Sequence, residues 1–309
     1  MLGFVGALTV GVIRHVGAWV IAKAPNHEGV PAEQDPVPED VSAVLQAEVG
    51  RPVAVLDVWI LEPQDPVGTT LVLHGIHGDK ASMVGVARSL RDRGQRAVLV
   101  DLRGHGASSG RWLSYGVRES TDLSQLLDQL EALGLLAGEV GIYGPSYGGA
   151  VALQTAALDP RIARVVSVST FASLRSVVPS YAQRAVPLLT GLLPTAILDA
   201  LADGALEDAG ELGGFSPAAA DPTSAIRRTR AQVLLIHGEA DENIPVHHAR
   251  TLRGACRAGA CELLTIPGAD HAGALQAPAT LSRALDFLAS GCLAPATASH
   301  VPWTRAPRF

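Results

Sequence analysis

The chain has 309 residues and a formal net charge of −6. Hydrophobic residues make up 48% of it and charged residues 17%, which excludes an intrinsically disordered protein. No basic field is present to attract nucleic acid, so we expect no nucleic-acid partner.

An apolar segment, residues 1–22, opens the chain and is interrupted by Thr9 and the pair Arg14–His15. A membrane-spanning helix needs about 20 apolar residues, and an arginine near its centre costs roughly 2.5–3.5 kcal/mol. We predict membrane association through residues 1–22, as a marginal span or an interfacial helix. The alternative is a helix that packs on the folded domain of a cytoplasmic protein. Residues 23–45, rich in Pro, Glu and Asp, are predicted to be a linker that completes an N-terminal region over 1–45.

Short apolar runs alternate with segments of helical spacing over residues 46–293, and this predicts one domain. Most of the runs are continuous, as expected of strands covered on both faces. Helical spacing recurs at 83–90, 123–130 and 281–288. The alternation predicts an α/β fold: a mostly parallel, twisted sheet of about eight strands with helices on both faces. The strand candidates are Val53–Leu61, Thr69–His74, Arg96–Asp101, Glu139–Tyr143, Arg164–Val168, Gln232–His237 and Glu262–Ile266.

One stretch, about residues 170–230, breaks this alternation. It holds roughly 60 residues with no clear strand, and a connection of that length in a compact domain is usually functional. Its apolar residues include Leu188, Leu192 and Ile197. We predict a functional segment or an inserted subdomain here. Residues 294–309, rich in Ala and Pro, are predicted to be a flexible tail.

The cysteines are Cys256, Cys261 and Cys292, and their spacing matches no metal site. We therefore expect no metal and no cofactor. Cys256 and Cys261 form a local disulfide if the protein is exported, or stay free thiols.

The clearest motif is G-P-S-Y-G-G over residues 144–149, between a predicted strand and an alanine-rich helix. In that context G-x-S-x-G places the serine on a sharp turn, with its hydroxyl projecting from the sheet edge. The flanking glycines are needed because a Cβ there would strike the adjacent strand or helix. Ser146 is the predicted nucleophile.

A serine hydroxyl needs a base, and the base needs a carboxylate to hold its tautomer. Among ten histidines, His271 lies on the loop after the last predicted strand, at the edge where Ser146 is expected. Asp241 follows the strand before it, and Glu239, Glu242 and Asp270 are the competing acids. We predict Asp241, because Glu239 leaves the strand too early and Asp270 is the sequence neighbour of His271.

Acyl transfer also needs donors for a developing oxyanion. The run L-V-L-H-G-I-H-G over 71–78 supplies a strand followed by His-Gly, so the backbone N–H groups of Ile76 and Tyr147 are the predicted donors. His77, Phe171 and Tyr181 are predicted to line the substrate pocket.

These motifs resemble, in order and spacing, the α/β-hydrolase superfamily over about residues 50–290. D-L-R-G-H-G-A-S over 101–108 is similar to a structural loop of that superfamily, which implies that His105 is not catalytic. G-V-R-E over 116–119, and His237-Gly238 with Asp241 and Pro245, resemble the serine aminopeptidase-like and prolyl-oligopeptidase-like branch. The resemblance implies an α/β-hydrolase fold with its lid at the insertion.

The predicted function is a serine hydrolase that cleaves carboxylic esters of a hydrophobic or acyl substrate through an acyl-enzyme. A small-molecule ester is the expected partner. The alternative is a serine peptidase or amidase that uses the same residues. A remote alternative is a scaffold that has kept the fold and lost the chemistry.

Overall fold

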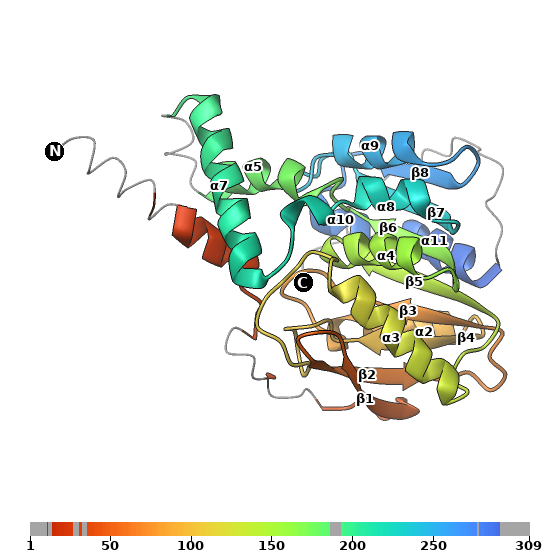
Figure 1. Ribbon diagram of the computed structural model, residues 1–309. Helices are drawn as coiled ribbons and strands as arrows, with labels where there is room; N and C mark the ends of the chain where they lie inside the picture. The colour runs from red at the N-terminus through yellow and green to blue at the C-terminus, as the bar shows by residue number, and fades with distance from the viewer. Residues whose placement is uncertain are drawn as a thin grey trace.

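The computed structural model describes residues 11, 14–26, 31–32, 36–185, 193–276 and 278–290. An eight-stranded sheet of order β1-β2-β4-β3-β5-β6-β7-β8 forms its centre (Figure 1). β2 runs antiparallel to both of its neighbours, and the remaining neighbours pair in parallel. The mostly parallel sheet is therefore confirmed. The strands are β1 (Ala43–Val49), β2 (Ala54–Leu61), β3 (Gly68–Val72), β4 (Gln95–Val100), β5 (Glu139–Pro145), β6 (Ile162–Val168), β7 (Gln232–Gly238) and β8 (Cys261–Ile266).

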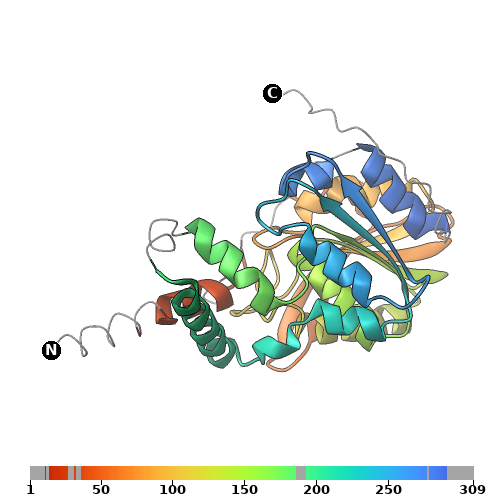
Figure 2. The same ribbon diagram turned by 90° about the horizontal axis from the view of Figure 1, so that it is seen from above.

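Helices cover both faces of the sheet, as the alternation of strands and helices predicts (Figures 1 and 2). Successive strand residues face opposite layers: Leu71 and Leu73 pack in one core and Val72 in the other. One layer consists of α3 (Glu119–Ala132), α4 (Tyr147–Leu158), α8 (Pro222–Arg228) and α9 (His247–Ala255). The other consists of η1 (Ala81–Met83), α2 (Val84–Arg91), α10 (His271–Gln276) and α11 (Pro278–Ser290).

Strand β1 takes in the end of the segment predicted as a linker. Its residues, A-V-L-Q-A-E-V, alternate between inward and outward positions, with Ala47 and Val49 buried and Val44 exposed. An edge strand covered on one face has this alternation, which a search for continuous apolar runs does not detect.

The segment predicted as a lid is mostly helical where the structure describes it. Between β6 and β7 the chain forms α5 (Leu174–Ala185), α7 (Thr195–Gly213) and η2 (Pro217–Ala219), and Figure 2 shows α5 and α7 projecting from the body of the molecule. The end of the insertion differs from the prediction, because α8 packs on α4 in the helical layer. Leu188 and Leu192 lie outside the described residues, and Ile197 is exposed on α7.

The described part of the N-terminal segment packs on α7. Residues 14–22 are helical, and Ala18 and Ala22 are fully buried against Ala209 of α7. Arg14, expected to disfavour a span, pairs with Asp208 of α7 at 2.6 Å. Among the residues searched, no helix is long and apolar enough to cross a bilayer. The described residues lend membrane association no support, and they match the alternative of a helix packed on the domain; residues 1–10 lie outside them.

We expect deletion of residues 1–24 to lower the melting temperature by about 5–10 °C, which differential scanning fluorimetry would measure. The deletion removes the buried Ala18, Ala22 and Ala24, and the Ile21 carbonyl that accepts a hydrogen bond from the Tyr115 hydroxyl at 2.8 Å. Deletion of residues 1–10 is the control, since it keeps these contacts. An unchanged melting temperature, with release of the truncated protein from a membrane pellet, would instead support the tether.

Cys256 and Cys261 form a disulfide, which settles the alternative left open by their spacing. Cys292 and the predicted tail lie outside the described residues.

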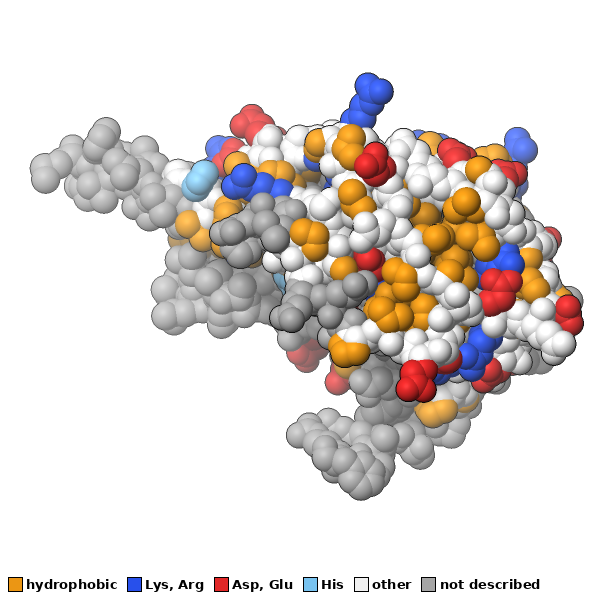
Figure 3. All heavy atoms as spheres, turned by 90° about the horizontal axis from the view of Figure 1, so that it is seen from below, with side chains coloured by type: hydrophobic (Ala, Val, Ile, Leu, Met, Phe, Trp, Pro, Cys, Tyr) orange, Lys and Arg blue, Asp and Glu red, His pale blue; other side chains and the backbone are white. Residues whose placement is uncertain are grey.

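On the face seen from below, basic and acidic side chains are interspersed among hydrophobic ones, with no field of one sign (Figure 3).

Candidate active site

Ser146 lies on the turn between β5 and α4, in a left-handed conformation with φ of 50°. Such a φ is uncommon for a residue with a side chain and marks local strain. The flanking glycines allow the turn: a Cβ on Gly144 would collide with the Gly148 carbonyl, and one on Gly148 with the His74 carbonyl. The turn therefore has the geometry that the motif predicts, with the serine at the carboxyl end of the central strand.

The structure brings Asp241 and His271 into direct contact. Asp241 follows β7 and His271 follows β8, so two neighbouring parallel strands deliver them to the same edge. His271 Nδ1 donates to Asp241 Oδ2 at 2.7 Å. The carboxylate thereby holds the imidazole in the tautomer whose Nε2 carries a lone pair.

Asp241 is held as an ionised acceptor. Its Oδ1 accepts hydrogen bonds from the backbone N–H groups of Asn243 and Ile244, both at 2.9 Å. Burial opposes ionisation, but the hydrogen bonds from His271 and Ile244 outweigh it and lower the pKa of Asp241 below its ordinary value. His237 supports the same loop, because its Nε2 bonds to the Ile244 carbonyl at 2.7 Å.

The competing acids point elsewhere. Glu239 accepts a hydrogen bond from the Thr265 hydroxyl at 2.8 Å on the exposed surface. Asp270 accepts from the backbone N–H of Gly273 at 2.7 Å. Glu242 is exposed. Asp241 is therefore the carboxylate that contacts His271.

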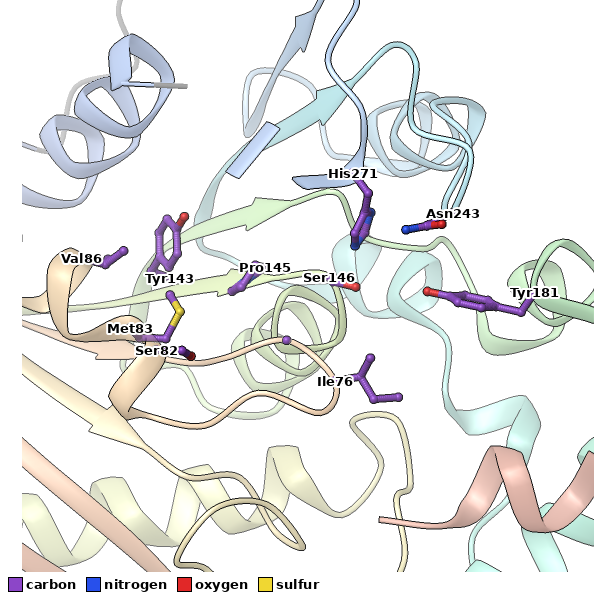
Figure 4. A pocket seen from close by; sticks show the side chains of 11 residues that line it. Ile76, Ser82, Met83, Val86, Tyr143, Pro145, Ser146, Tyr181, Asn243 and His271 are labelled. Carbon is purple, nitrogen blue, oxygen red and sulfur yellow. The ribbon is translucent and has the colours of Figure 1, made fainter. Parts of the chain in front are cut away.

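Ser146 and His271 line one cavity of about 550 Å³. Figure 4 shows the Ser146 hydroxyl and the imidazole of His271 facing the same space. No hydrogen bond joins the two side chains within the described chain. Bonds between nucleophile and base are often long without substrate and tighten in the complex, so the missing bond does not count against His271 as the base.

The loop after β3 carries one predicted oxyanion donor. His74 fixes its start: Nδ1 donates to the Gly75 carbonyl at 2.8 Å, and Nε2 accepts from the backbone N–H of Leu102 at 3.0 Å. Burial lowers the pKa of His74 to about 4, so the ring stays neutral and its role is structural. The N–H groups of Ile76 and Tyr147 make no hydrogen bond within the described chain, which leaves both available to an oxyanion.

Buried charged residues contact the two segments that carry the predicted oxyanion donors. Lys80, at the far end of the loop, lies 2.8 Å from Asp57 and 2.5 Å from Asp101. On the other side, the hydroxyl of Tyr147 donates to Glu119 at 2.9 Å, and Glu119 is fully buried. Lys80 and its two carboxylates hold the neighbouring backbone rigidly, because breaking a buried pair leaves an uncompensated charge. Glu119 is held by hydrogen bonds from Ser114, Gly116 and Tyr147.

Of the three residues predicted to line the substrate pocket, one borders the cavity and two do not. Tyr181 of α5 lines the cavity. His77 does not: it is exposed and is not among the residues that line the cavity. Phe171 does not either, because it is buried in the core beneath the lid, where its ring contacts Tyr115. His105 is buried, and its ring centroid lies 4.7 Å from that of His74 with the ring planes tilted by 54°, which agrees with a structural role.

Sequence reasoning missed most of the cavity wall. Met83 and Val86 were assigned only to an apolar helix face, and Tyr143 only to a strand. The sequence periodicity of these residues predicts that they face inward. A local sequence pattern cannot distinguish a core residue from one that borders a cavity. The cavity is lined by Gly75, Ile76, Ser82, Met83, Val86, Tyr143, Pro145, Ser146, Tyr181, Asn243 and His271.

Comparison with known proteins agrees with this architecture. The model of the alpha/beta hydrolase family matches residues 70–284. The uncharacterized protein YqkD of Bacillus subtilis (strain 168) is 28% identical over 62% of this chain and 60% of its own length. The sn-1-specific diacylglycerol lipase ABHD11 of Danio rerio is 37% identical over 34% of this chain and 32% of its own. The chain thus spans less than two thirds of these relatives.

Solved structures resemble the whole fold. The esterase Pf2001 of Pyrococcus furiosus superposes with a TM-score of 0.65 at 20% identity, over 84% of this chain and 97% of its own. Est1E of Butyrivibrio proteoclasticus, solved with ferulic acid bound, has a TM-score of 0.58 at 18% identity, over 78% of this chain and 97% of its own. At such identities the likeness concerns the fold.

Proposed function

Since this chain belongs to the α/β hydrolase family, we propose that it is a serine hydrolase that cleaves carboxylic esters of a hydrophobic or acyl substrate. The observation that carries the proposal is the Asp241–His271 pair, which faces the cavity lined by Ser146. The family model does not separate the serine aminopeptidase-like branch from the rest, so that assignment stays a prediction.

The first half of the reaction forms an acyl-enzyme. His271 Nε2 takes the proton of the Ser146 hydroxyl as the oxygen attacks the ester carbonyl, while Asp241 stabilises the imidazolium. The N–H groups of Ile76 and Tyr147 donate to the oxyanion of the tetrahedral intermediate. The imidazolium then protonates the leaving alcohol, and the carbon–oxygen bond to it breaks.

The second half regenerates the serine. A water molecule occupies the place vacated by the alcohol and gives a proton to His271 Nε2 as its oxygen attacks the acyl carbon. Collapse of the second intermediate returns that proton to Ser146 and releases the carboxylic acid.

The walls of the cavity favour an ester over a peptide with a free amine. No acidic side chain is among the described residues that line it, so nothing there would pair with a substrate ammonium. Ile76, Met83, Val86 and Pro145 supply apolar surface instead. Burying an acyl group against them stabilises the complex by about 25 cal/mol per Å² removed from water.

Two substrate series test the proposal on the full chain. We expect turnover of p-nitrophenyl acyl esters, together with labelling by a fluorophosphonate. We expect aminoacyl p-nitroanilides to be hydrolysed at least about a hundredfold more slowly. N-acetylated anilides are the matched control: an aminopeptidase would strongly prefer the free amine. Fast cleavage of free-amine anilides would favour the peptidase, and failure of the fluorophosphonate to label the protein would favour the inactive scaffold.

A further inference from the structure

The cavity has two sides, with Ser146 between them. One side, which we call the Tyr143 limb, is formed by Ser82, Met83, Val86 and Tyr143. The other is formed by Tyr181, Asn243 and His271. Figure 4 shows the two groups on opposite sides of Ser146.

The position of His271 decides which side takes which part of an ester. Its Nε2 must protonate the leaving alcohol and then activate water, so both oxygens come to the side of the imidazole. The acyl group stays bonded to Ser146 during this exchange and has to leave that side free. It therefore extends into the Tyr143 limb.

The limb follows strand β5 away from the nucleophile. Tyr143 and Pro145 are two residues apart on the strand and so face the same side. At about 3.3 Å per residue, the Cα of Tyr143 lies roughly 10 Å from that of Ser146 along the strand. Figure 4 shows the Tyr143 ring between Val86 and Pro145. An acyl chain of several carbons is needed to reach the phenol.

The Tyr143 hydroxyl is an unused polar group in this limb. The residue is 3% exposed, and its hydroxyl makes no hydrogen bond with any residue that the structure describes. Burial raises the pKa of Tyr143 above its ordinary value, so the phenol is neutral and can donate or accept. A hydroxyl on the cavity wall without a partner in the described chain favours a ligand that supplies one.

Ser82, an exposed residue, adds a second hydroxyl to the limb. Its hydroxyl donates to the Asp79 carbonyl at 2.6 Å and keeps lone pairs for a further donor. Pro145 lies between the Tyr143 ring and Ser146, and Met83 and Val86 add apolar surface to the limb (Figure 4). The limb thus combines the apolar side chains of Met83 and Val86 with two hydroxyls, those of the buried Tyr143 and the exposed Ser82.

We propose that the Tyr143 limb binds an acyl group that carries a hydroxyl at its far end, with Tyr143 as the residue that selects it. This inference rests on the proposed ester hydrolysis and names its substrate class: esters of ω-hydroxylated or ring-hydroxylated carboxylic acids. Sites built to hydrogen-bond a substrate hydroxyl reject the analogue that lacks it far more strongly than an apolar pocket rejects a change of one methylene.

Matched pairs of methyl esters test the inference, with proton release as the readout. Each pair consists of an ω-hydroxyalkanoate of roughly six to ten carbons and the alkanoate with a methyl group in place of the hydroxyl. For the wild type we expect kcat/KM to favour the hydroxylated ester by about tenfold or more at the best length. Tyr143→Phe should bring this ratio to about one or below, with little change in melting temperature, because the ring stays packed.

Tyr181→Phe is the matched control, since it removes a phenolic hydroxyl from the other side of the same cavity. Its ratio should stay within about twofold of the wild-type ratio. If esters are hydrolysed and Tyr143→Phe leaves the preference unchanged, or if the wild type prefers none of the hydroxylated esters, the inference is wrong while ester hydrolysis stands. If no ester is hydrolysed and no fluorophosphonate label appears, the proposed function itself has failed.

Discussion

Ser146→Ala is expected to lower kcat/KM for ester hydrolysis by about 10⁴-fold or more, without a change in melting temperature. Removal of the oxygen that attacks the carbonyl leaves only binding and the oxyanion donors. The side chain makes no hydrogen bond with the described residues, so its loss costs little stability. Initial rates with a p-nitrophenyl ester and labelling by a fluorophosphonate measure the two consequences.

Ser169→Ala is a matched control for this variant. Ser169 is also a buried serine in a left-handed conformation, with φ of 51°, and it does not line the cavity. We expect its activity to stay within about threefold of the wild type and its labelling to persist. Retention of more than about a tenth of the wild-type rate by Ser146→Ala would show that another group is the nucleophile.

Asp241→Asn is expected to lower kcat by about 10⁴-fold. The remaining oxygen of the amide can still accept the backbone N–H groups of Asn243 and Ile244, which keeps the loop in place. Its NH₂ group then faces His271 Nδ1 and stabilises the tautomer that carries the proton on Nε2. That imidazole cannot accept the proton of Ser146, so the base is lost with the geometry intact.

Glu239→Gln separates this effect from a general loss of negative charge near the site. Glu239 lies two residues from Asp241, but its carboxylate bonds to Thr265 on the surface. We expect the variant to keep its rate within about twofold of the wild type, as surface changes usually do. A severe loss in Glu239→Gln combined with a mild one in Asp241→Asn would reverse the assignment of the acid.

The turn at Ser146 and the candidate residues Asp241 and His271 could be predicted from local sequence. The turn at Ser146 depends on glycines a few residues away, and a strand–turn–helix pattern is contained in one short stretch. Asp241 and His271 each follow a strand, and parallel neighbouring strands end at one edge of the sheet. Periodicity likewise predicted the alternation of strands and helices, because solvent faces only one side of each helix.

Only the tertiary structure decided what surrounds those residues. Arg14 and Asp208 pair across 194 positions of the chain, and the helix over 14–22 has a partner for its buried face only once α7 is placed beside it. Tyr143 and Met83 have the spacing of ordinary core residues, and whether they meet a neighbour or a cavity depends on how η1 and α2 pack on the sheet. The sequence by itself thus determined the fold class and the candidate reacting groups, since both follow from short-range periodicity and turn chemistry. The shape of the cavity and the place of the N-terminal helix depend on long-range packing, which no local pattern records.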